Sequence, residues 1–337
     1  MRVKQSMGRL ILDRQSLTTV PEEVFASAGL RELHLDGNQL SELPKNICNL
    51  TGLEALSLYG NQLSTVPSEL AELKRLRRLS LGKNKLTSIP AAIFQLKNLQ
   101  TLNLAENAIK QIPAEIAGLS NLRMLDLGHN RISRLPEEMG ELTQLSDALY
   151  LSENQLEEIP DGIFAGMQYL RYLGLTHNRL RALPLTIGNL KSLEELRLYN
   201  NALIALPETI GRLGKLKELH LQNNELAELR AEVGDLSELL ELVLSNNHLT
   251  VLPNSLCRLA KLERLDLRNN PLERLPEELG RLQRLTHLDL RASRLSALPE
   301  SMASMHNLRK LDLRWTKLVG HPTWLQDLQS RGCRILL

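Results

Sequence analysis

A pair of leucines in the pattern L-x-L returns along the whole chain at an almost constant interval. Taking the first leucine of each pair as an anchor, we find fourteen units whose anchors lie 23 residues apart, except for two consecutive steps of 24. A fixed period of this length predicts a stack of similar units, each packed only on its neighbours. The anchors are Leu10, Leu33, Leu56, Leu79, Leu102, Leu125, Leu149, Leu173, Leu196, Leu219, Leu242, Leu265, Leu288 and Leu311.

Two further positions repeat with the leucines. Asparagine stands five residues after the anchor in eleven units, with Gln15, Ser293 and Thr316 in the others, and proline stands eleven residues after it in thirteen, with Arg230 as the exception. Because leucines alternate with polar residues, L-x-L predicts a short strand with one apolar side. An asparagine amide both donates and accepts, so it can satisfy neighbouring turns. Proline ends the extended segment.

The pattern L-x-x-L-x-L-x-x-N-x-L resembles the leucine-rich repeat family, from about Met7 to Leu318. The following L-P-x-x-I-x-x-L-x-x-L resembles the Ras-group subclass, which intracellular plant proteins, Ras-binding scaffolds and many bacterial proteins share. The resemblance implies an α/β solenoid: a leucine-rich repeat horseshoe with a parallel concave β-sheet of about 14 strands and an irregular, 3-10 or short-helical convex side. We expect the array, with a divergent first unit, over residues 1–318 and a C-terminal cap over residues 319–337.

The segment PTWLQDLQSRGCRILL has the pattern of that cap. Thr323 is expected to cap a short helix that buries Trp324, Leu325 and Leu328. Residues 334–337 are expected to add a last strand. A cap of this kind covers the apolar end of a solenoid.

Charge and cysteine content constrain the partners and the compartment. The 41 Lys and Arg and 39 Asp and Glu give a net charge of +2, which does not favour nucleic acid or an anionic membrane as a partner. No apolar run is long enough to span a bilayer, and the N-terminal residues lack the core of a signal peptide. The three cysteines show no disulfide framework. We therefore expect a cytoplasmic protein and favour a monomer; an effector exported without a cleavable signal peptide would have the same features.

The residues one before and one, three and four after each anchor are expected to face outward, packed by nothing inside the molecule. These positions hold four of the five tyrosines, although aromatics make up only 3% of the chain. Exposed aromatic and arginine side chains are common anchors of protein interfaces, although tyrosine also suits a strand surface by propensity alone. The residues predicted to bind a partner on the concave face are Tyr59, Tyr150, Tyr172, His177, Arg197, Tyr199, His220, Arg268, Arg291, Arg314 and Trp315.

Charged residues form rows on the same predicted face. Glu195, Glu218 and Glu241 each precede an anchor in three successive units, and the tetrapeptide L-D-L-R occurs in three later units. The charges either offset each other between strands, which is a structural arrangement, or form an acidic site and a basic site. For L-D-L-R we favour the structural interpretation. Its charged residues are Asp266, Asp289, Asp312, Arg268, Arg291 and Arg314.

The stretch from Leu145 to Leu175 carries both 24-residue steps. One extra residue precedes the strand of Tyr150, and the other lies in PDGIFAGMQYL, where Phe164 is expected to fill the back of the core. The insertions are either tolerated loop changes or adjustments of the binding face beside Tyr150 and Tyr172. We favour the second hypothesis because both insertions flank these tyrosines.

Motifs of catalysis and nucleotide binding are absent from the sequence. It contains no G-x-S-x-G, G-x-x-x-x-G-K-[ST] or H-E-x-x-H, and its eight histidines lack metal-ligand spacing. A cation site on the three glutamates is disfavoured because no loop supplies further oxygen ligands. We therefore expect no cofactor, no metal and no enzymatic activity.

The sequence as a whole predicts a non-enzymatic module that binds a protein partner through the concave face, as a signalling scaffold or effector. A small GTPase or a host signalling protein is the partner that the family resemblance implies. The alternative is the substrate-recognition part of an enzyme, such as a ubiquitin ligase or a kinase, whose catalytic domain is absent from this chain.

Overall fold

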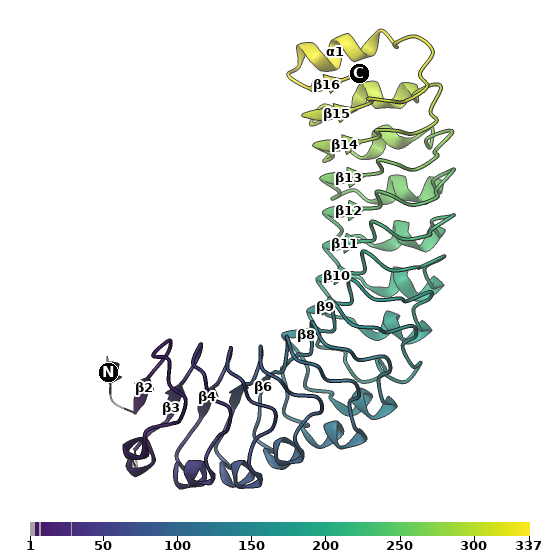
Figure 1. Cartoon of the computed structure of the whole chain (residues 1–337). Helices are drawn as coiled ribbons and strands as arrows, with labels where there is room; N and C mark the ends of the chain where they lie inside the picture. The colour runs from purple at the N-terminus through teal and green to yellow at the C-terminus, as the bar shows by residue number, and fades with distance from the viewer. Residues whose placement is uncertain (1–3, 7, 28) are drawn as a thin grey trace. The chain divides into compact units, whose positions relative to one another are not determined.

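The computed structural model describes residues 4–6, 8–27 and 29–337; Met7, where the predicted array begins, lies outside them. The chain divides into two compact units. Unit 1 comprises residues 1–156 and 165–170, and unit 2 comprises residues 157–164 and 171–337. The boundary along the chain therefore falls in the segment that carries the second extra residue. Each unit is a solenoid in which short strands and short 3-10 helices alternate (Figure 1).

Unit 1 contains seven parallel strands, each centred on an anchor leucine, and anchors pair with anchors, as Leu33 does with Leu56. An additional strand, β1, pairs antiparallel with β2 and was not predicted from the sequence. The strands are β1 (Lys4–Ser6), β2 (Arg9–Ile11), β3 (Glu32–His34), β4 (Ala55–Ser57), β5 (Arg78–Ser80), β6 (Thr101–Asn103), β7 (Met124–Asp126) and β8 (Ala148–Tyr150). The 3-10 helices are η1 (Glu22–Ala26), η2 (Lys45–Asn49), η3 (Ser68–Glu72), η4 (Ala91–Gln95), η5 (Ala114–Gly118) and η6 (Glu137–Glu141).

Unit 2 continues the same design with seven anchor strands and a terminal strand, all parallel. The strands are β9 (Tyr172–Gly174), β10 (Glu195–Arg197), β11 (Glu218–His220), β12 (Glu241–Val243), β13 (Arg264–Asp266), β14 (His287–Asp289), β15 (Lys310–Asp312) and β16 (Arg334–Leu336). The helices are η7 (Leu185–Asn189), η8 (Glu208–Arg212), η9 (Ala231–Asp235), η10 (Asn254–Arg258), η11 (Leu279–Arg281), η12 (Glu300–Ser304) and the α-helix α1 (Trp324–Ser330). The fourteen predicted strands and the 3-10 convex side are thus confirmed.

The core of each unit is a stack of leucines closed by an asparagine ladder. All fourteen anchor leucines are buried. Asn247 shows the role of the ladder: its Nδ2 donates to the carbonyl oxygens of Leu221 and Leu244 at 3.0 and 2.9 Å, and its Oδ1 accepts from the amide of Leu226 at 3.0 Å. One buried amide therefore satisfies backbone groups of two neighbouring repeats. Phe164, predicted to fill the core, is fully buried.

The residue four positions after each anchor adopts a left-handed backbone conformation in all fourteen described repeats. Gly37 and Gly60 suit this conformation, and so do the asparagines of unit 2. His129 (φ 53°) and Trp315 (φ 62°) adopt it at a steric cost. This shared backbone conformation turns the chain away from the strand direction, and it was not predicted from the sequence.

The proline of each repeat opens the 3-10 segment. Pro184 has φ −68° and ψ 154°, and the turn closes when the amide of Leu190 donates to the carbonyl of Ile187. Arg230, the exception in the sequence, adopts almost the same conformation, with φ −65° and ψ 149°. Proline therefore prearranges this corner but is not required for it.

The C-terminal segment forms α1 and β16, and α1 buries Trp324, Leu325 and Leu328. Thr323 precedes the helix, but the expected capping bond is wrong. Its backbone already has helical angles (φ −60°, ψ −31°), and its side chain makes no cap hydrogen bond, because a capping side chain needs an extended backbone.

The back of unit 2 is packed too closely for a side chain at Gly234 and at Gly280. A Cβ atom at Gly280 would lie 1.9 Å from the carbonyl oxygen of Ser301 on the next helix, and one at Gly234 would lie 2.2 Å from that of Ser255. These glycines allow adjacent 3-10 helices to approach closely.

We predict that Gly280→Ala lowers the free energy of unfolding by about 1–3 kcal/mol, because its methyl group overlaps backbone of the next repeat. Gly214→Ala is the matched control, since no atom lies within 4 Å of the place its methyl group would take. Urea unfolding of both variants measures the difference. Equal stability of the two would contradict the close packing.

We predict that Arg230→Pro raises the free energy of unfolding by about 0.4–1 kcal/mol. The native φ of −65° suits proline, which restricts the unfolded chain. Thermal unfolding should show a higher midpoint for this variant than for Arg230→Ala. A lower midpoint for the proline variant would show that this corner differs from the thirteen others.

Candidate functional site

The open face of each unit is the side of the strands opposite the leucine core. The predicted tyrosines at outward positions (Tyr59, Tyr150, Tyr172 and Tyr199) are all half-buried there, whereas Tyr169 lies off the strands and is 51% exposed. The predicted site is divided between the units. Unit 1 carries Tyr59 and Tyr150, separated by β5 to β7, and unit 2 carries the remaining residues.

In unit 1, Tyr59 lies across its neighbouring strands. Its hydroxyl donates a short hydrogen bond to Glu106, which belongs to the second repeat along. This bond and burial raise the pKa of Tyr59. The ring passes over Gly82, where a Cβ atom would lie 2.9 Å from the tyrosine Cδ2. Glu106 and Gly82 were not among the predicted site residues. In the sequence, only the lack of a side chain at Gly82 indicated that a large neighbour could lie over this position.

In unit 2, four predicted residues form what we call the tyrosine cluster: Tyr172, His177, Arg197 and Tyr199. The Arg197 guanidinium lies 5.8 Å from the centroid of the Tyr172 ring. His177 and Tyr199 meet edge to face, with centroids 5.5 Å apart and an angle of 80° between the ring planes. Arg197 also donates to Glu195 of its own strand. The structure thus brings these four side chains together on β9, β10 and the turns that follow them.

An exposed asparagine ladder runs beside the tyrosine cluster. The Nδ2 atoms of Asn223, Asn246 and Asn269 each donate to the Oδ1 of the preceding asparagine, at 2.5, 2.6 and 2.6 Å. Asn200 begins the ladder and lies 2.8 Å from Nε2 of His177. All four asparagines occupy the left-handed turn position, and Ala292 takes that position in the next repeat.

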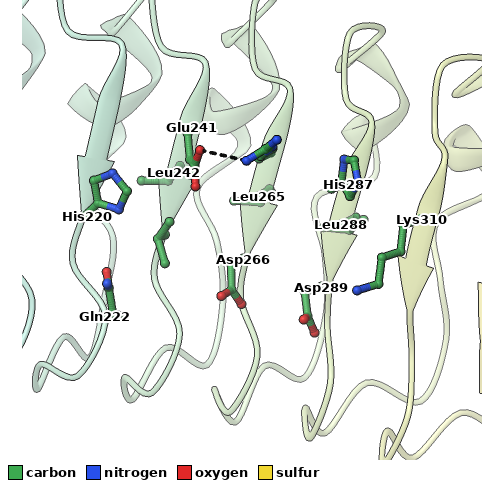
Figure 2. A pocket seen from close by; sticks show the side chains of 12 residues that line it. His220, Gln222, Glu241, Leu242, Leu265, Asp266, His287, Leu288, Asp289 and Lys310 are labelled. Carbon is green, nitrogen blue, oxygen red and sulfur yellow. Dashed lines mark ion pairs between the residues drawn. The ribbon is translucent and has the colours of Figure 1, made fainter. Parts of the chain in front are cut away.

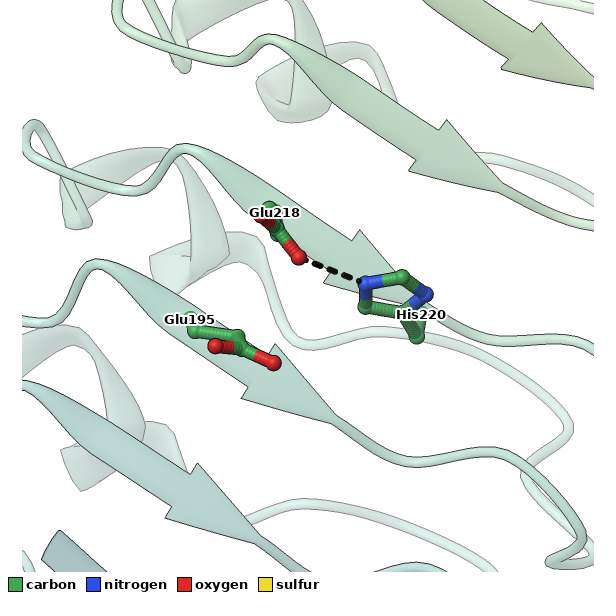
Figure 3. A group of neighbouring side chains, drawn as sticks. All are labelled: Glu195, Glu218 and His220. Atoms are coloured by element: carbon green, nitrogen blue, oxygen red, sulfur yellow. Dashed lines mark hydrogen bonds and ion pairs between the residues drawn. The ribbon is translucent and has the colours of Figure 1, made fainter.

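The row of three glutamates is in register on β10, β11 and β12. Each glutamate has a basic partner: Glu195 accepts from Arg197, Glu218 lies 3.1 Å from His220, and Glu241 lies 3.6 Å from Arg264. Among the described residues, Glu195, Glu218 and His220 have ligand atoms within 4.8 Å of one another, a spacing that could hold a metal ion (Figure 3). Arg197 places a positive charge at this group, which opposes a bound cation.

The L-D-L-R repeats pair their charges mainly within each strand. Arg291 donates to both carboxylate oxygens of Asp289, and Arg314 donates to Asp312 at 2.8 Å. Asp266 is 3.4 Å from Arg268. One contact crosses strands, from Arg291 to Asp312 at 3.4 Å. The geometry supports the structural interpretation of these rows, but most of the pairs form within one repeat and not between strands as expected.

The expectation that outward positions are packed by nothing inside the molecule is wrong. Asp312 and Ser245 are fully buried and Thr176 is 4% exposed. Arg291 and Arg314 contact the Asp312 carboxylate. Trp315 is the opposite case: it is 73% exposed, with the Arg314 guanidinium 5.5 Å from its ring centroid.

A groove of about 570 Å³ crosses the open face of unit 2 from β11 to β15. Its floor includes the anchors Leu242, Leu265 and Leu288, and charged side chains stand along both sides (Figure 2). Of the predicted site residues, only His220 lines it. The groove was not predicted from the sequence, because its depth depends on the conformation of the charged side chains that line it.

Comparisons with known proteins agree with this architecture. A leucine rich repeat family model matches residues 5–63, 74–132 and 261–318, and a model for a leucine-rich repeat region matches residues 164–246. A further leucine rich repeat model matches residues 238–259. A search of curated protein sequences finds no significant match.

Three solved structures illustrate the similarity. A leucine-rich repeat protein of Leptospira interrogans is 33% identical over 97% of this chain and 95% of its own, with a TM-score of 0.78. An internalin of Listeria monocytogenes shares the fold at 21% identity, with coverage of 94% and 88% and a TM-score of 0.77. The ectodomain of an Arabidopsis thaliana receptor kinase, in complex with Casparian strip integrity factor 2, is 28% identical over 94% of this chain and 45% of that one, with a TM-score of 0.66.

The repeats and the open sheet face define a solenoid protein of the kind that generally serves as a binding module. The chain belongs to the leucine-rich repeat family. Within the described residues, no helix combines the length and apolarity needed to cross a membrane.

We predict that Asp312→Asn lowers the free energy of unfolding at pH 7 by about 1.5–3 kcal/mol, since Arg314 loses its charged partner and Arg291 keeps only Asp289. Burial alone would raise the pKa of Asp312, but the hydrogen bonds from Arg314 and the nearby arginine charges hold it below its ordinary value of 3.8. The stabilisation is therefore complete above that value and is lost as the pH falls further.

Urea unfolding across pH 3–7 tests this: the difference between wild type and Asp312→Asn should shrink below pH of about 4. Asp235→Asn removes an exposed ion pair with Arg258 and should cost less than about 1 kcal/mol. A constant difference for Asp312→Asn down to pH 3 would contradict the assigned ion pairs.

Proposed function

We propose that this protein is a non-enzymatic module that binds a protein partner through its open sheet face. The observation that carries the proposal is the tyrosine cluster of unit 2. It combines Tyr172, Tyr199 and Arg197, which are half-buried, with the exposed His177 on one surface. Aromatic and arginine side chains that are held in place by their neighbours lose little entropy on binding, so they suit the centre of an interface.

The finer proposal is that the protein acts as a signalling scaffold or effector. The Arabidopsis ectodomain in complex with Casparian strip integrity factor 2 is a precedent for a related repeat array that engages another molecule. The family resemblance favours a small GTPase or a host signalling protein as the partner, and a cytoplasmic location or export as an effector.

We predict that Tyr172→Ala and Tyr199→Ala each weaken partner binding by about 2 kcal/mol or more while leaving the melting temperature within about 2 °C of wild type. The side chains are half-buried on the surface, so their removal opens no core cavity. The partner is captured from an extract of the source organism on immobilised protein, purified, and titrated by calorimetry against each variant.

Tyr169→Ala serves as the matched control, because Tyr169 lies off the sheet face. Tyr150→Ala, alone and combined with Tyr172→Ala, tests whether the tyrosine of unit 1 contributes. If the partner binds the Tyr150/Tyr172 double variant and Tyr199→Ala as tightly as wild type, the tyrosines are not the docking surface.

A further inference from the structure

Four basic residues stand side by side on β13 to β16, each one position before the centre of its strand. Arg264 is in register with His287, His287 with Lys310, and Lys310 with Arg334. We call these four residues the basic row. Lys310 and Arg334 carry like charges in lateral register on paired strands, so they repel each other until an opposite charge neutralises them.

The acidic residues that share strands β13, β14 and β15 with the basic row are already paired. They are the aspartates two residues further along β13, β14 and β15, and each is held by the arginine that follows it. Lys310 extends toward Asp289 (Figure 2), but both oxygens of Asp289 accept from Arg291. The aspartates therefore do not neutralise the basic row.

Within the basic row, Arg264 alone has an acidic partner, Glu241, at 3.6 Å. In the part of the chain that the structure describes, Lys310 and Arg334 form no ion pair. A second cavity of about 490 Å³ lies beside the basic row. Arg284 and Arg309 line it together with Arg264 and His287 of the row.

Burial and the neighbouring positive charges act in the same direction on the histidine of the basic row. Burial, followed by the charges of Arg264, Lys310 and Arg309, lowers the pKa of His287, and Glu241 acts weakly in the opposite sense. Glu263 is the one carboxylate that lines the second cavity, and in the described residues it too forms no ion pair. The excess positive charge at this edge of the sheet therefore comes from Lys310 and Arg334, with Arg284 and Arg309 beside them.

We propose that the basic row binds a short acidic segment of the protein partner. This inference rests on the proposed function and identifies the chemistry of part of the partner. The row spans three strand intervals of about 4.8 Å, so a segment of about five extended residues covers it. Carboxylates of aspartate and glutamate would receive charge-assisted hydrogen bonds from Lys310 and Arg334.

The neighbouring charges favour a protein segment over a nucleic acid. The same strand position holds Glu195, Glu218 and Glu241 on β10, β11 and β12. The side chains at this position therefore change from basic to acidic toward the tyrosine cluster. The basic partners of these glutamates leave no excess positive charge there for a long polyanion to contact, whereas a polypeptide can be acidic at one end and neutral or basic at the other.

The test uses the full chain and a fluorescein-labelled peptide of six consecutive glutamates between glycine pairs. Fluorescence anisotropy should detect binding of this peptide and none of the matching glutamine peptide. The double variant Lys310→Glu and Arg334→Glu should weaken binding by about tenfold or more, and raising NaCl from about 0.05 to about 0.5 M should weaken binding to wild type. The double variant should fold as well as wild type, because Lys310 and Arg334 form no ion pair with any described residue.

The matched control is Arg75→Glu with Lys110→Glu, which makes the same change in net charge at exposed positions of unit 1. Absence of binding to the glutamate peptide, equal weakening by the control, or equally tight binding of an oligothymidylate of the same charge would each overturn the proposal. Peptide binding should survive Tyr172→Ala. If partner capture needs the tyrosines but not Lys310 and Arg334, the inference fails and the proposed function stands.

Discussion

The structure depends on one asparagine side chain, which stands at the same position in eleven of the fourteen repeats. A single repeat has one apolar side and a turn whose backbone groups have no partners of their own, so it cannot fold alone. Asn224 illustrates the solution: its Nδ2 donates to the carbonyls of Leu198 and Leu221, and its Oδ1 accepts from Leu203. The bonds join two repeats, so the turn of each repeat is completed by the next one. At Ser293, where a hydroxyl replaces the amide, the buried oxygen has no hydrogen-bond partner.

The fold could be predicted because its requirements appear as residue types at fixed spacing. Leucine alternation sets the strands, asparagine sets the turns, and proline sets the start of each 3-10 segment. Arg230 shows the limit of such signals, since it takes the proline conformation with no proline present. The hairpin partner β1 was not predictable, because Lys4–Ser6 carries no apolar alternation. The left-handed turn position was also hidden, since residues as different as His129 and Trp315 occupy it.

The positions of the candidate site residues could be predicted from the sequence, but the contacts and ion pairs between their side chains could not. Sequence spacing placed Tyr172 and Arg197 on one face, but the contact between them depends on rotamers that spacing does not specify. It also aligned the aspartates with the arginines without revealing that Asp312 is fully buried between two of them. The basic row was missed because it combines Arg, His and Lys, so no repeated letter marks it, and its significance appears only once the aspartates are known to be paired.

The exposed asparagine ladder has a mechanical consequence for unit 2. Its amides join His177 and Asn200 to Asn269 through consecutive short bonds, which fix the interval between the strands that they follow. A change in the spacing of the strands would stretch all of these hydrogen bonds together, so the ladder restrains the strand spacing from β9 to β13. It stops at Ala292. The strands beyond that residue, β15 and β16, carry Lys310 and Arg334 of the basic row and therefore form the more compliant end of the surface.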